Sequence, residues 1–322
     1  AWLLTGQVRR WAIARGTLDL PNERSSHVIP TPRGGGVAFA IVVTGIAFAL
    51  AFLRSDQVMA LIAAGGLAIA VLGYADDVYS LRVLPRLIVH FAAAICVVAV
   101  FVIQSDQPLL VDVPAFLIAV VLAVGIVWSI NLFNFMDGID GIAASQAIFC
   151  GAASFLLSNY TPDSVSWITV TLVLLGACVG FLIWNWPPAK IFMGDVGSGF
   201  LGFWMAALAI ALHTSGALSI WASVVLNAMF VADATSTLIC RVLRRERWHA
   251  PHRSHVYQRL SRKFGSHMVV TSGLWLLNVF LILPLAYVTE KVESGAPAAA
   301  ATTLIVLSVG CVLLGAGRPD QS

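Results

Sequence analysis

Long runs of apolar residues, repeated along almost the whole chain, most limit how this sequence can fold. An α-helix crosses a bilayer core with about 20 consecutive apolar residues. The chain contains ten such runs, at approximately 34–53, 57–75, 87–103, 114–133, 142–158, 165–185, 198–214, 217–240, 267–288 and 298–316. Charged residues make up only 11% of the sequence, against about 25% in soluble domains. We therefore expect an all-α, polytopic membrane protein, which excludes a disordered chain, a disulfide scaffold or an ordinary cytosolic enzyme.

The N-terminal residues indicate that the parent protein has an eleventh span. The chain begins without Met, and residues 1–7 are too few to cross a bilayer. We expect that an N-terminal helix has been shortened or removed, because no small-residue cleavage site of a signal peptide is present. No linker divides the sequence, so residues 1–322 are treated as one transmembrane domain.

The basic residues fall almost entirely on one side of the predicted membrane. Ten crossings define two sets of alternating segments, and 17 of the 19 Lys and Arg residues lie in the first set. This set comprises 9–33, 76–86, 134–141, 186–197, 241–266 and the C-terminal tail. The positive-inside rule places it in the cytoplasm. A net charge of +3 gives no argument for nucleic acid as a partner.

Five acidic residues cluster in these cytoplasmic segments, in three distinct contexts. Asp76 and Asp77 end one apolar run, Asp137 and Asp140 lie in Asn-Leu-Phe-Asn-Phe-Met-Asp-Gly-Ile-Asp-Gly, and Asp195 lies in Phe-Met-Gly-Asp-Val-Gly-Ser-Gly. Carboxylate oxygens suit Mg²⁺, which is usually held by one or two carboxylates together with water and substrate phosphates. The absence of cysteine from these motifs argues against zinc. The pattern predicts a magnesium site, with Mn²⁺ as a substitute ion.

The spacing within the second cluster predicts where its helix ends. Asn131, Asn134, Asp137 and Asp140 recur at every third residue, so on an uninterrupted α-helix the first and last would lie on opposite faces. They can meet one ligand only if the helix stops near Asp137, and we predict that it does. We also expect backbone N–H groups at the start of the helix after Asp195 to bind phosphate.

Two basic segments complete the candidate site. The first runs from residue 22 to 36 and includes His27 and Arg33, and the second is the 241–266 segment with His252, Arg253 and His255. Arg and protonated His donate charge-assisted hydrogen bonds to phosphate oxygens, so a phosphate-rich substrate fits both. Ordinary lipid anchoring is the alternative for the arginines before residue 249.

Other polar or reactive residues inside the apolar runs have weaker interpretations. Asp233 is equally consistent with a functional intramembrane carboxylate and with a structural pair to a neighbouring helix. His90 and His213 are interpreted as incidental. The five cysteines show no regular spacing and are interpreted as small buried apolar residues.

The motifs, in this order, resemble those of the polyprenyl-phosphate N-acetylhexosamine-1-phosphate transferases, glycosyltransferase family 4. The resemblance rests on the Asp-Asp pair, the Asn-x-x-Asn-x-x-Asp-Gly-x-Asp-Gly block, the Phe-Met-Gly-Asp-x-Gly-Ser block and the His-containing loop, and it covers nearly the whole chain. It implies transfer of a sugar-1-phosphate from a UDP-N-acetylhexosamine to undecaprenyl phosphate, with release of UMP, at the cytoplasmic face of the bacterial inner membrane. It further implies that Asp195 is a magnesium ligand, that Asp76 and Asp77 act on the acceptor phosphate or position the metal, and that the Asn/Asp block contacts the nucleotide and takes part in catalysis.

The His-containing loop bears on the branch of the family. The branch that makes the peptidoglycan lipid precursor carries consecutive histidines there, whereas this chain reads His252-Arg-Ser-His255. The difference favours the branch that initiates O-antigen or related polysaccharides, with UDP-GlcNAc or a UDP-linked 6-deoxy-N-acetylhexosamine such as FucNAc as donor. A phospho-muramyl-pentapeptide transferase is the alternative within the family, and a cation-coupled transporter is the alternative outside it. The identity of the sugar, a one-step or covalent mechanism, and assembly as a homodimer are left open.

Overall fold

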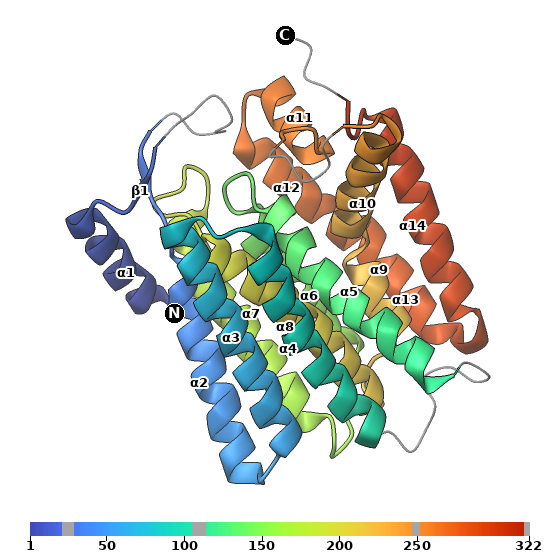
Figure 1. Cartoon of the computed structure of the whole chain (residues 1–322). Coiled ribbons are helices and arrows are strands. Elements are labelled where there is room, and N and C mark those ends of the chain that lie inside the picture. Colours follow the sequence, from blue (N-terminus) through green and yellow to red (C-terminus); the bar gives the residue numbers. More distant parts are fainter. Residues whose placement is uncertain (21–28, 105–113, 247–251, 319–322) are drawn as a thin grey trace.

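The computed structural model describes residues 1–20, 29–104, 114–246 and 252–318. Figure 1 shows a bundle of helices that run side by side, with β1 and α11 at one end. The predicted spans correspond to α2 (Gly36–Arg54), α3 (Gln57–Tyr79), α4 (Val83–Gln104), α5 (Ala115–Met136), α6 (Ile142–Leu157), α7 (Val165–Asn185), α8 (Asp195–Thr214), α9 (Ile220–Leu226) with α10 (Ala228–Leu243), α12 (His267–Leu277) with the π-helix η1 (Asn278–Ile282) and α13 (Leu283–Lys291), and α14 (Ala296–Leu313).

The lengths and apolar character of these helices confirm a polytopic membrane protein. Within the described ranges, eight helices are long and apolar enough to cross a bilayer, or nine if α9 and α10 count as one span. The remaining predicted span, α6, has only 16 residues. The outward faces expose large apolar side chains such as Phe52 and Phe280, which are 86% and 76% exposed. Such faces are stable against lipid, whereas in water they would be a liability.

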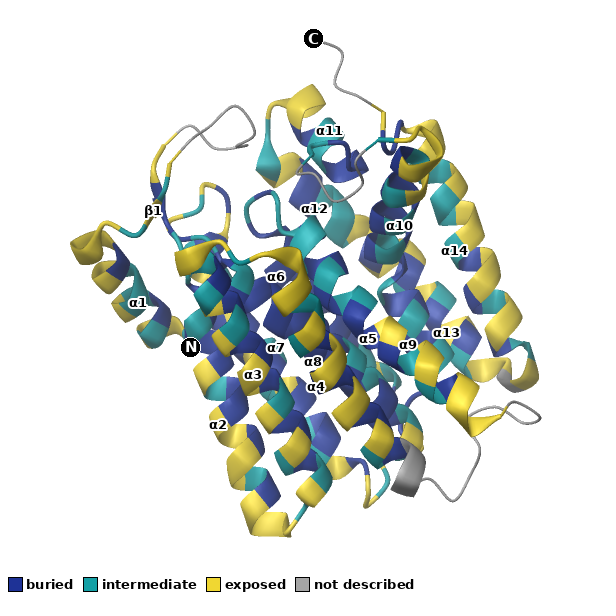
Figure 2. Cartoon of the chain, in the orientation of Figure 1, coloured by how far each residue is buried: buried dark blue, intermediate teal, exposed yellow. Residues whose placement is uncertain are grey.

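Helix α8 lies at the centre of the bundle. In its most apolar 18-residue stretch, 78% is buried inside the protein, a larger share than in any other candidate span of the described chain. Figure 2 shows its buried residues behind the more exposed outer helices. Glycines allow its neighbours to come close: a Cβ on Gly202 would lie 2.3 Å from the carbonyl oxygen of Ser129 in α5. Small residues at helix contacts are the usual means of close packing in membranes.

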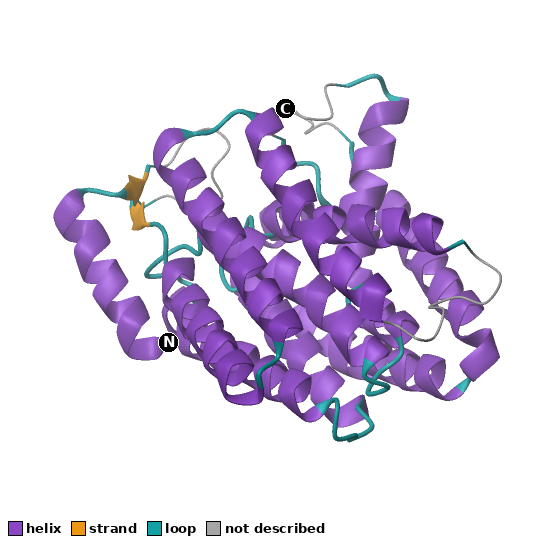
Figure 3. Cartoon of the chain, turned by 60° about the horizontal axis from the view of Figure 1, so that its bottom comes forward, coloured by secondary structure: helices purple, strands orange, loops and turns teal. Residues whose placement is uncertain are grey.

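The described residues before α2 include regular structure, whereas the predicted spans left 9–33 as a loop. Helix α1 (Trp2–Arg15) packs beside α7, and the indole Nε1 of Trp184 donates to the carbonyl of Trp2 at 3.1 Å. Strands β1 (Leu18–Asp19) and β2 (Thr31–Pro32) then form a two-stranded antiparallel ladder, visible in orange in Figure 3. Hydropathy alone could not find α1, because this helix is short and carries three arginines.

The span predicted at 217–240 is not one straight helix. Helices α9 and α10 meet at Asn227 with a bend of 71°. Helix α11 (Val256–Phe264), which follows α10, and the short 3-10 helix η2 (Glu293–Gly295), between α13 and α14, complete the described elements. The bend separates two helices of 7 and 16 residues, which a hydropathy window averages into one apolar run.

The cysteines are all unpaired, as predicted, but they are not all buried. Cys150 and Cys178 are buried, whereas Cys96 is exposed on α4. The prediction of burial is therefore wrong for Cys96. A thiol can face lipid as easily as a protein core, so an apolar run in the sequence does not distinguish these two environments.

Candidate active site

Glycines bring three helix ends together at the end of the bundle that carries β1 and α11 (Figure 1). A Cβ on Gly36, the first residue of α2, would lie 2.3 Å from the Cα of Gly197 in α8. A Cβ on Gly73 of α3 would lie 2.4 Å from the carbonyl oxygen of Asp195. No side chain fits at such distances, so only glycine permits this approach. The motif residues next to these glycines are thereby brought to one place.

Asp77 caps the N-terminus of α8. Its Oδ1 accepts the backbone N–H of Asp195 at 2.9 Å, and its Oδ2 accepts that of Val196 at 3.1 Å. The residue in the capping position of α8 is Gly194, which has a φ of 78° and no side chain. Asp77 therefore supplies from another helix both the capping oxygens and the negative charge that a helix N-terminus favours.

These contacts correct one prediction about α8. The backbone N–H groups of Gly197 and Ser198 donate to the carbonyl of Gly194, and those of Asp195 and Val196 donate to Asp77. The first-turn donors that the sequence predicted as a phosphate cradle are thus already used. The sequence pattern could not reveal this, because the capping carboxylate is more than 100 residues away.

Arg33 joins the two carboxylates. Its Nη2 lies 2.8 Å from Oδ1 of Asp77 and donates to Oδ1 of Asp195 at 2.9 Å. Burial by itself lowers the pKa of the Arg33 guanidinium, but the negative charges of Asp77 and Asp195 outweigh it and raise the pKa above the ordinary value. The predicted basic residue is therefore a permanent cation at the centre of the site.

Asp195 is also contacted from α5. Nδ2 of Asn134 donates to Oδ1 of Asp195 at 2.9 Å and to Oγ of Ser198 at 3.1 Å. Asn131 lies one turn earlier on α5, and its own amide donates to the carbonyl of Val127 at 2.7 Å. The structure thus brings the predicted Asn134 into direct contact with Asp195. Asn131, Asn134 and Asp195 together line a small cavity.

Two basic residues, Arg86 and His90, also line this cavity. They were not identified as site residues from the sequence. The cavity has a volume of about 20 Å³, and Asp76, Asp195, Asn131, Arg86 and His90 are among the residues that line it. It has room for about one water molecule or ion. Arg86 forms an ion pair with Oδ2 of Asp76, whose Oδ1 accepts the N–H of Leu81 at 2.7 Å.

His90 differs from its interpretation as incidental. It is 5% exposed, and its Nδ1 has no hydrogen-bond partner within the described ranges. Arg86 and His90 are four residues apart, so they lie on one face of α4. This spacing, close behind the Asp-Asp pair, was the signal in the sequence that could have identified them.

Helix α5 ends where the sequence predicted. Its last residue is Met136, and Asp137 is the C-cap with φ −92° and ψ 43°. Burial raises the pKa of Asp137 well above its ordinary value, and the charge of Asp195 adds to this. The end of α5 therefore places the Asp137 carboxylate close enough to Asp195 for the two charges to interact.

Asp140, in contrast, is fully engaged in the fold. Its Oδ2 accepts the N–H of Ala189 at 3.0 Å, and its Oδ1 lies 3.2 Å from Nδ1 of His267. The hydroxyl of Thr271 donates to its carbonyl at 3.0 Å. These contacts fix the 137–141 turn between α12 and the segment before α8. His267 is a third residue, after Arg86 and His90, that the sequence analysis missed.

Asp233 holds the His-containing segment in place. Its Oδ1 accepts the N–H of Val256 at 2.9 Å, its Oδ2 accepts that of Tyr257 at 3.0 Å, and Nδ1 of His255 lies 3.4 Å from Oδ1. This buried carboxylate therefore caps α11 as Asp77 caps α8. Of the two interpretations from the sequence, the structure shows the pairing with a neighbouring helix, through the backbone of α11 and with His255 beside it.

The His-containing segment packs on the end of α5. The hydroxyl of Tyr257 donates to the carbonyl of Phe135 at 2.8 Å, and the ring of His255 stacks on Phe135 with centroids 6.2 Å apart. A Cβ on Gly138 would lie 2.2 Å from the Tyr257 hydroxyl. The two motifs, which are more than 100 residues apart in the sequence, thus share one surface.

His252 is neutral in this arrangement. Burial, followed by the charges of His255 and Arg241, lowers the pKa of His252 to about 4, although Asp233 opposes the shift. Its Nδ1 lies 3.0 Å from Oγ of Ser254. At neutral pH the ring is a hydrogen-bonding group rather than the cation that the sequence suggested. Arg253 is partly exposed beside it, and His27 lies outside the described residues.

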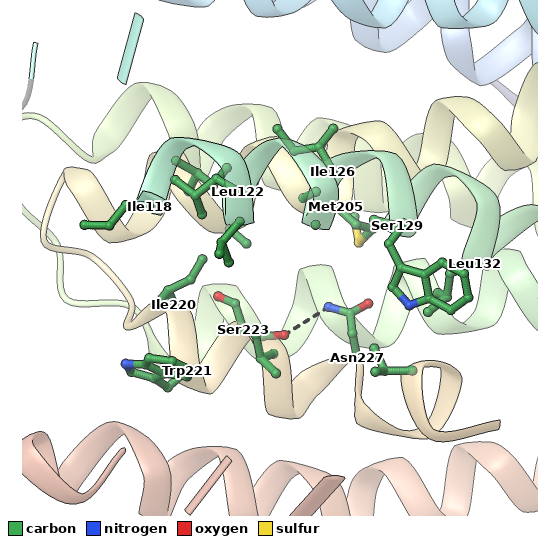
Figure 4. Close-up of a pocket in the computed structure, with 18 of the residues that line it drawn as sticks. Ile118, Leu122, Ile126, Ser129, Leu132, Met205, Ile220, Trp221, Ser223 and Asn227 are labelled. Carbon is green, nitrogen blue, oxygen red and sulfur yellow. Dashed lines mark hydrogen bonds between the residues drawn. The ribbon is translucent and has the colours of Figure 1, made fainter. Parts of the chain in front are cut away.

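An apolar cavity opens beside this site, between α5, α8 and the α9–α10 pair. Its volume is about 390 Å³, and its lining is almost entirely apolar. Figure 4 shows Ile118, Leu122 and Ile126 on one side and Ile220 and Trp221 on the other. Trp128, which also lines it, stacks on Phe135 with centroids 6.3 Å apart. Because Phe135 also stacks on His255, one chain of ring contacts connects the cavity wall to the His-containing segment.

Comparison with known proteins agrees with these motifs. The sequence model of glycosyl transferase family 4 matches residues 58–213. The chain is 32% identical to the probable undecaprenyl-phosphate N-acetylglucosaminyl 1-phosphate transferase of Bacillus subtilis, over 86% of this chain and 78% of that protein. It is also 32% identical to the decaprenyl-phosphate N-acetylglucosaminephosphotransferase of Mycolicibacterium smegmatis, over 85% of this chain and 76% of that protein.

A second group of relatives carries a different name. The chain is 31% identical to the phospho-N-acetylmuramoyl-pentapeptide-transferase of Desulforudis audaxviator, over 65% of this chain and 69% of that protein. The similarity to the first group extends over most of both chains. The protein is therefore a polytopic membrane enzyme that belongs to glycosyl transferase family 4.

Proposed function

We propose that this enzyme transfers N-acetylhexosamine-1-phosphate from a UDP-sugar to undecaprenyl phosphate, giving undecaprenyl-diphosphate-sugar and UMP. The observation that carries the proposal is the convergence of Arg33, Asp77, Asn134 and Asp195 beside a large apolar cavity. A charged site suits the two phosphate groups, and the cavity suits a long isoprenoid chain. The names of the relatives in Bacillus subtilis and Mycolicibacterium smegmatis, which specify N-acetylglucosamine, support the hexosamine donor.

The donor set of the site fits a magnesium ion. Asp195, Asn131 and Asn134 line the small cavity and offer oxygen ligands, and no cysteine lines it. Asp137 lies close enough to Asp195 for their charges to interact. In the described ranges no three His, Cys, Asp or Glu side chains form a ready-made metal cage. Mg²⁺ usually needs only one or two carboxylates because water and substrate phosphates complete its shell. We expect Asp195 to hold the ion, which would supply positive charge to the phosphate oxygens.

The reaction exchanges one phosphoanhydride bond for another. An oxygen of the acceptor phosphate attacks the sugar-bearing phosphorus of the donor, and the bond from that phosphorus to the UMP oxygen breaks. Repulsion between two anionic substrates is the main obstacle, so positioning and positive charge are the expected contributions of the protein. Arg33 already bridges two carboxylates here, and it can turn to a phosphate oxygen when one arrives.

The other site residues have positioning roles in this proposal. Asp76 is held by Arg86 and by the N–H of Leu81, which suits orientation of the acceptor phosphate. A phosphate monoester has its second pKa near 6, so at pH 7 the acceptor is largely ionised and needs little help from a base. His252 and His255 face the end of α5 and would donate hydrogen bonds to phosphate oxygens, with Arg253 beside them.

The side of the membrane and the pathway are part of the proposal. The carboxylate site lies at the same end of the bundle as the basic segments, which the positive-inside rule assigns to the cytoplasm. We place the enzyme in the bacterial inner membrane and its reaction at the start of O-antigen or related polysaccharide synthesis. The muramyl-pentapeptide alternative is less favoured because the similarity to the Desulforudis audaxviator relative of that name covers 65% of this chain, whereas the similarity to the Bacillus subtilis relative covers 86%. Membership of an enzyme family disfavours the transporter.

The deciding experiment measures Mg²⁺-dependent UMP release from a panel of UDP-sugars with undecaprenyl phosphate. The panel contains UDP-GlcNAc, a UDP-linked 6-deoxy-N-acetylhexosamine and UDP-MurNAc-pentapeptide. Release from one of the first two, lost in Asp195→Asn and kept in Asp163→Asn, is expected, because Asp163 is exposed in a turn outside the site. Release from the pentapeptide donor alone, or from none with folded protein, would contradict the proposal.

A further inference from the structure

The break between α9 and α10 leaves a buried carbonyl group that the helix itself does not satisfy. In a straight helix, the carbonyl of Leu226 would accept the N–H of the residue four positions later. Instead it accepts the Nε2 amide of Gln146 in α6 at 3.0 Å, and the Sγ of Cys150 lies 3.4 Å away. An unsatisfied carbonyl is costly at membrane depth. Gln146 therefore stabilises the bent form specifically, because a straight helix would not need it.

Gln146 is itself held from a third helix. Its Oε1 accepts the Nδ2 amide of Asn278 at 2.8 Å. Asn278 is the first residue of η1, the π-helical interruption between α12 and α13. Both side chains are buried, with 0% and 1% exposure. The two amides thus connect α6, the bend and η1.

The bend shapes the apolar cavity. Ser223, Val224 and Asn227 on either side of the break line it, and Figure 4 shows the hydrogen bond from Asn227 Nδ2 to the Ser223 carbonyl at 3.0 Å. Further along α10, Asp233 holds the start of α11. The angle between α9 and α10 therefore sets both the wall of the cavity and the position of the His-containing segment.

We infer that Gln146 and Asn278 are positioning residues for a long-chain lipid acceptor, because they hold the α9–α10 bend open beside the apolar cavity. The inference rests on the proposed function and goes beyond it, since neither residue contacts the carboxylate site. Without the Gln146 amide, the carbonyl of Leu226 has no donor in the bent form. A straighter helix is then more stable, because the carbonyl accepts a backbone N–H of its own helix. The cavity wall then moves, and an isoprenoid chain that fills the cavity is bound less well. An acceptor too short to fill it is bound as before.

The test compares two acceptors in one variant. Undecaprenyl phosphate fills the cavity, whereas geranyl phosphate, with two isoprene units, does not. For Gln146→Leu, loss of the buried hydrogen bonds is expected to raise KM for undecaprenyl phosphate about tenfold. KM for geranyl phosphate and kcat at saturation are expected to stay within about twofold of wild type. Gln146→Glu, with a protonated carboxyl that both donates and accepts, is expected to restore the long-chain KM.

A matched control is Thr171→Val, because this buried hydroxyl donates only within its own helix, to the Trp167 carbonyl at 2.9 Å. It is expected to leave both acceptors unaffected. If Gln146→Leu does not fold, Asn278→Leu carries the test and is expected to raise the long-chain KM about threefold. Equal effects on both acceptors, or none, overturn the inference alone. Failure of wild type to use either acceptor overturns the proposed function as well.

Discussion

Replacing Asp77 tests whether this carboxylate acts through the N-terminus of α8. It accepts two backbone N–H groups, at 2.9 and 3.1 Å, and forms an ion pair with Arg33 at 2.8 Å. Its side chain is 6% exposed, whereas that of Arg33 is 35% exposed, so the ion pair is partly screened. A hydrogen bond to a charged group contributes about 1.5–3 kcal/mol. Allowing for non-additivity, we expect Asp77→Ala to destabilise the first turn of α8 by about 4 kcal/mol.

Hydrogen exchange measured by mass spectrometry on the detergent-solubilised protein reports this local free energy. A loss of about 4 kcal/mol lowers the exchange protection of the amides of Asp195 and Val196 about 1,000-fold. Asp77→Asn keeps one accepting oxygen, so about half of that free energy and a fall of about 30-fold are expected. Activity should fall in the same order, because Asp195 begins the turn that loosens.

The control is Asp56, which caps the opposite end of α3 by accepting the N–H of Met59 at 2.9 Å. Asp56→Ala is expected to cost about 1 kcal/mol and to change protection only at the start of α3. If Asp77→Ala leaves the protection of Asp195 and Val196 within about fivefold of wild type, about 1 kcal/mol, then Asp77 does not cap α8 as we describe. A loss of activity in that variant would then have to come from direct contact with substrate.

Three further outcomes test other parts of the site. His267→Phe removes the ring nitrogen beside Asp140 and is expected to lower kcat about tenfold with KM little changed, whereas His267→Asn retains most activity. Gly73→Ala is expected to lower the free energy of unfolding by about 1–3 kcal/mol in thermal melts, whereas Gly45→Ala, with no atom within 4 Å, does not. Because the pKa of His252 is lowered to about 4, its neutral form stabilises the fold above pH 6.5, and this stability is lost as pH falls towards 4. The melting temperature of His252→Gln should therefore fall less over that range than wild type, and an equal fall would contradict a buried neutral His252.

Parts of the site could be predicted because they depend on local sequence. The end of α5 at Met136 followed from the three-residue spacing of polar residues. One of these residues, Asn134, donates to Asp195 in the structure. The functions assigned to Asp76, Asp137, His255 and the other site residues remain predictions. Asp140 was grouped with Asp137 because of its spacing, yet its side chain is bound to Ala189 and His267.

The length of an apolar run and the distribution of basic residues are properties of short stretches of chain. They determine directly which segments enter the bilayer and on which side the flanking segments remain. For this reason the sequence by itself determined an all-α membrane fold, the limits of most spans and the three acidic motifs. Only the tertiary structure decided that Asp77 and Asp233 cap helices far from them in sequence, and that the 217–240 run bends at Asn227. Hydrogen bonds between distant segments depend on how the helices pack. In an almost uniformly apolar chain, hydropathy does not distinguish the helix faces that contact other helices from those that contact lipid.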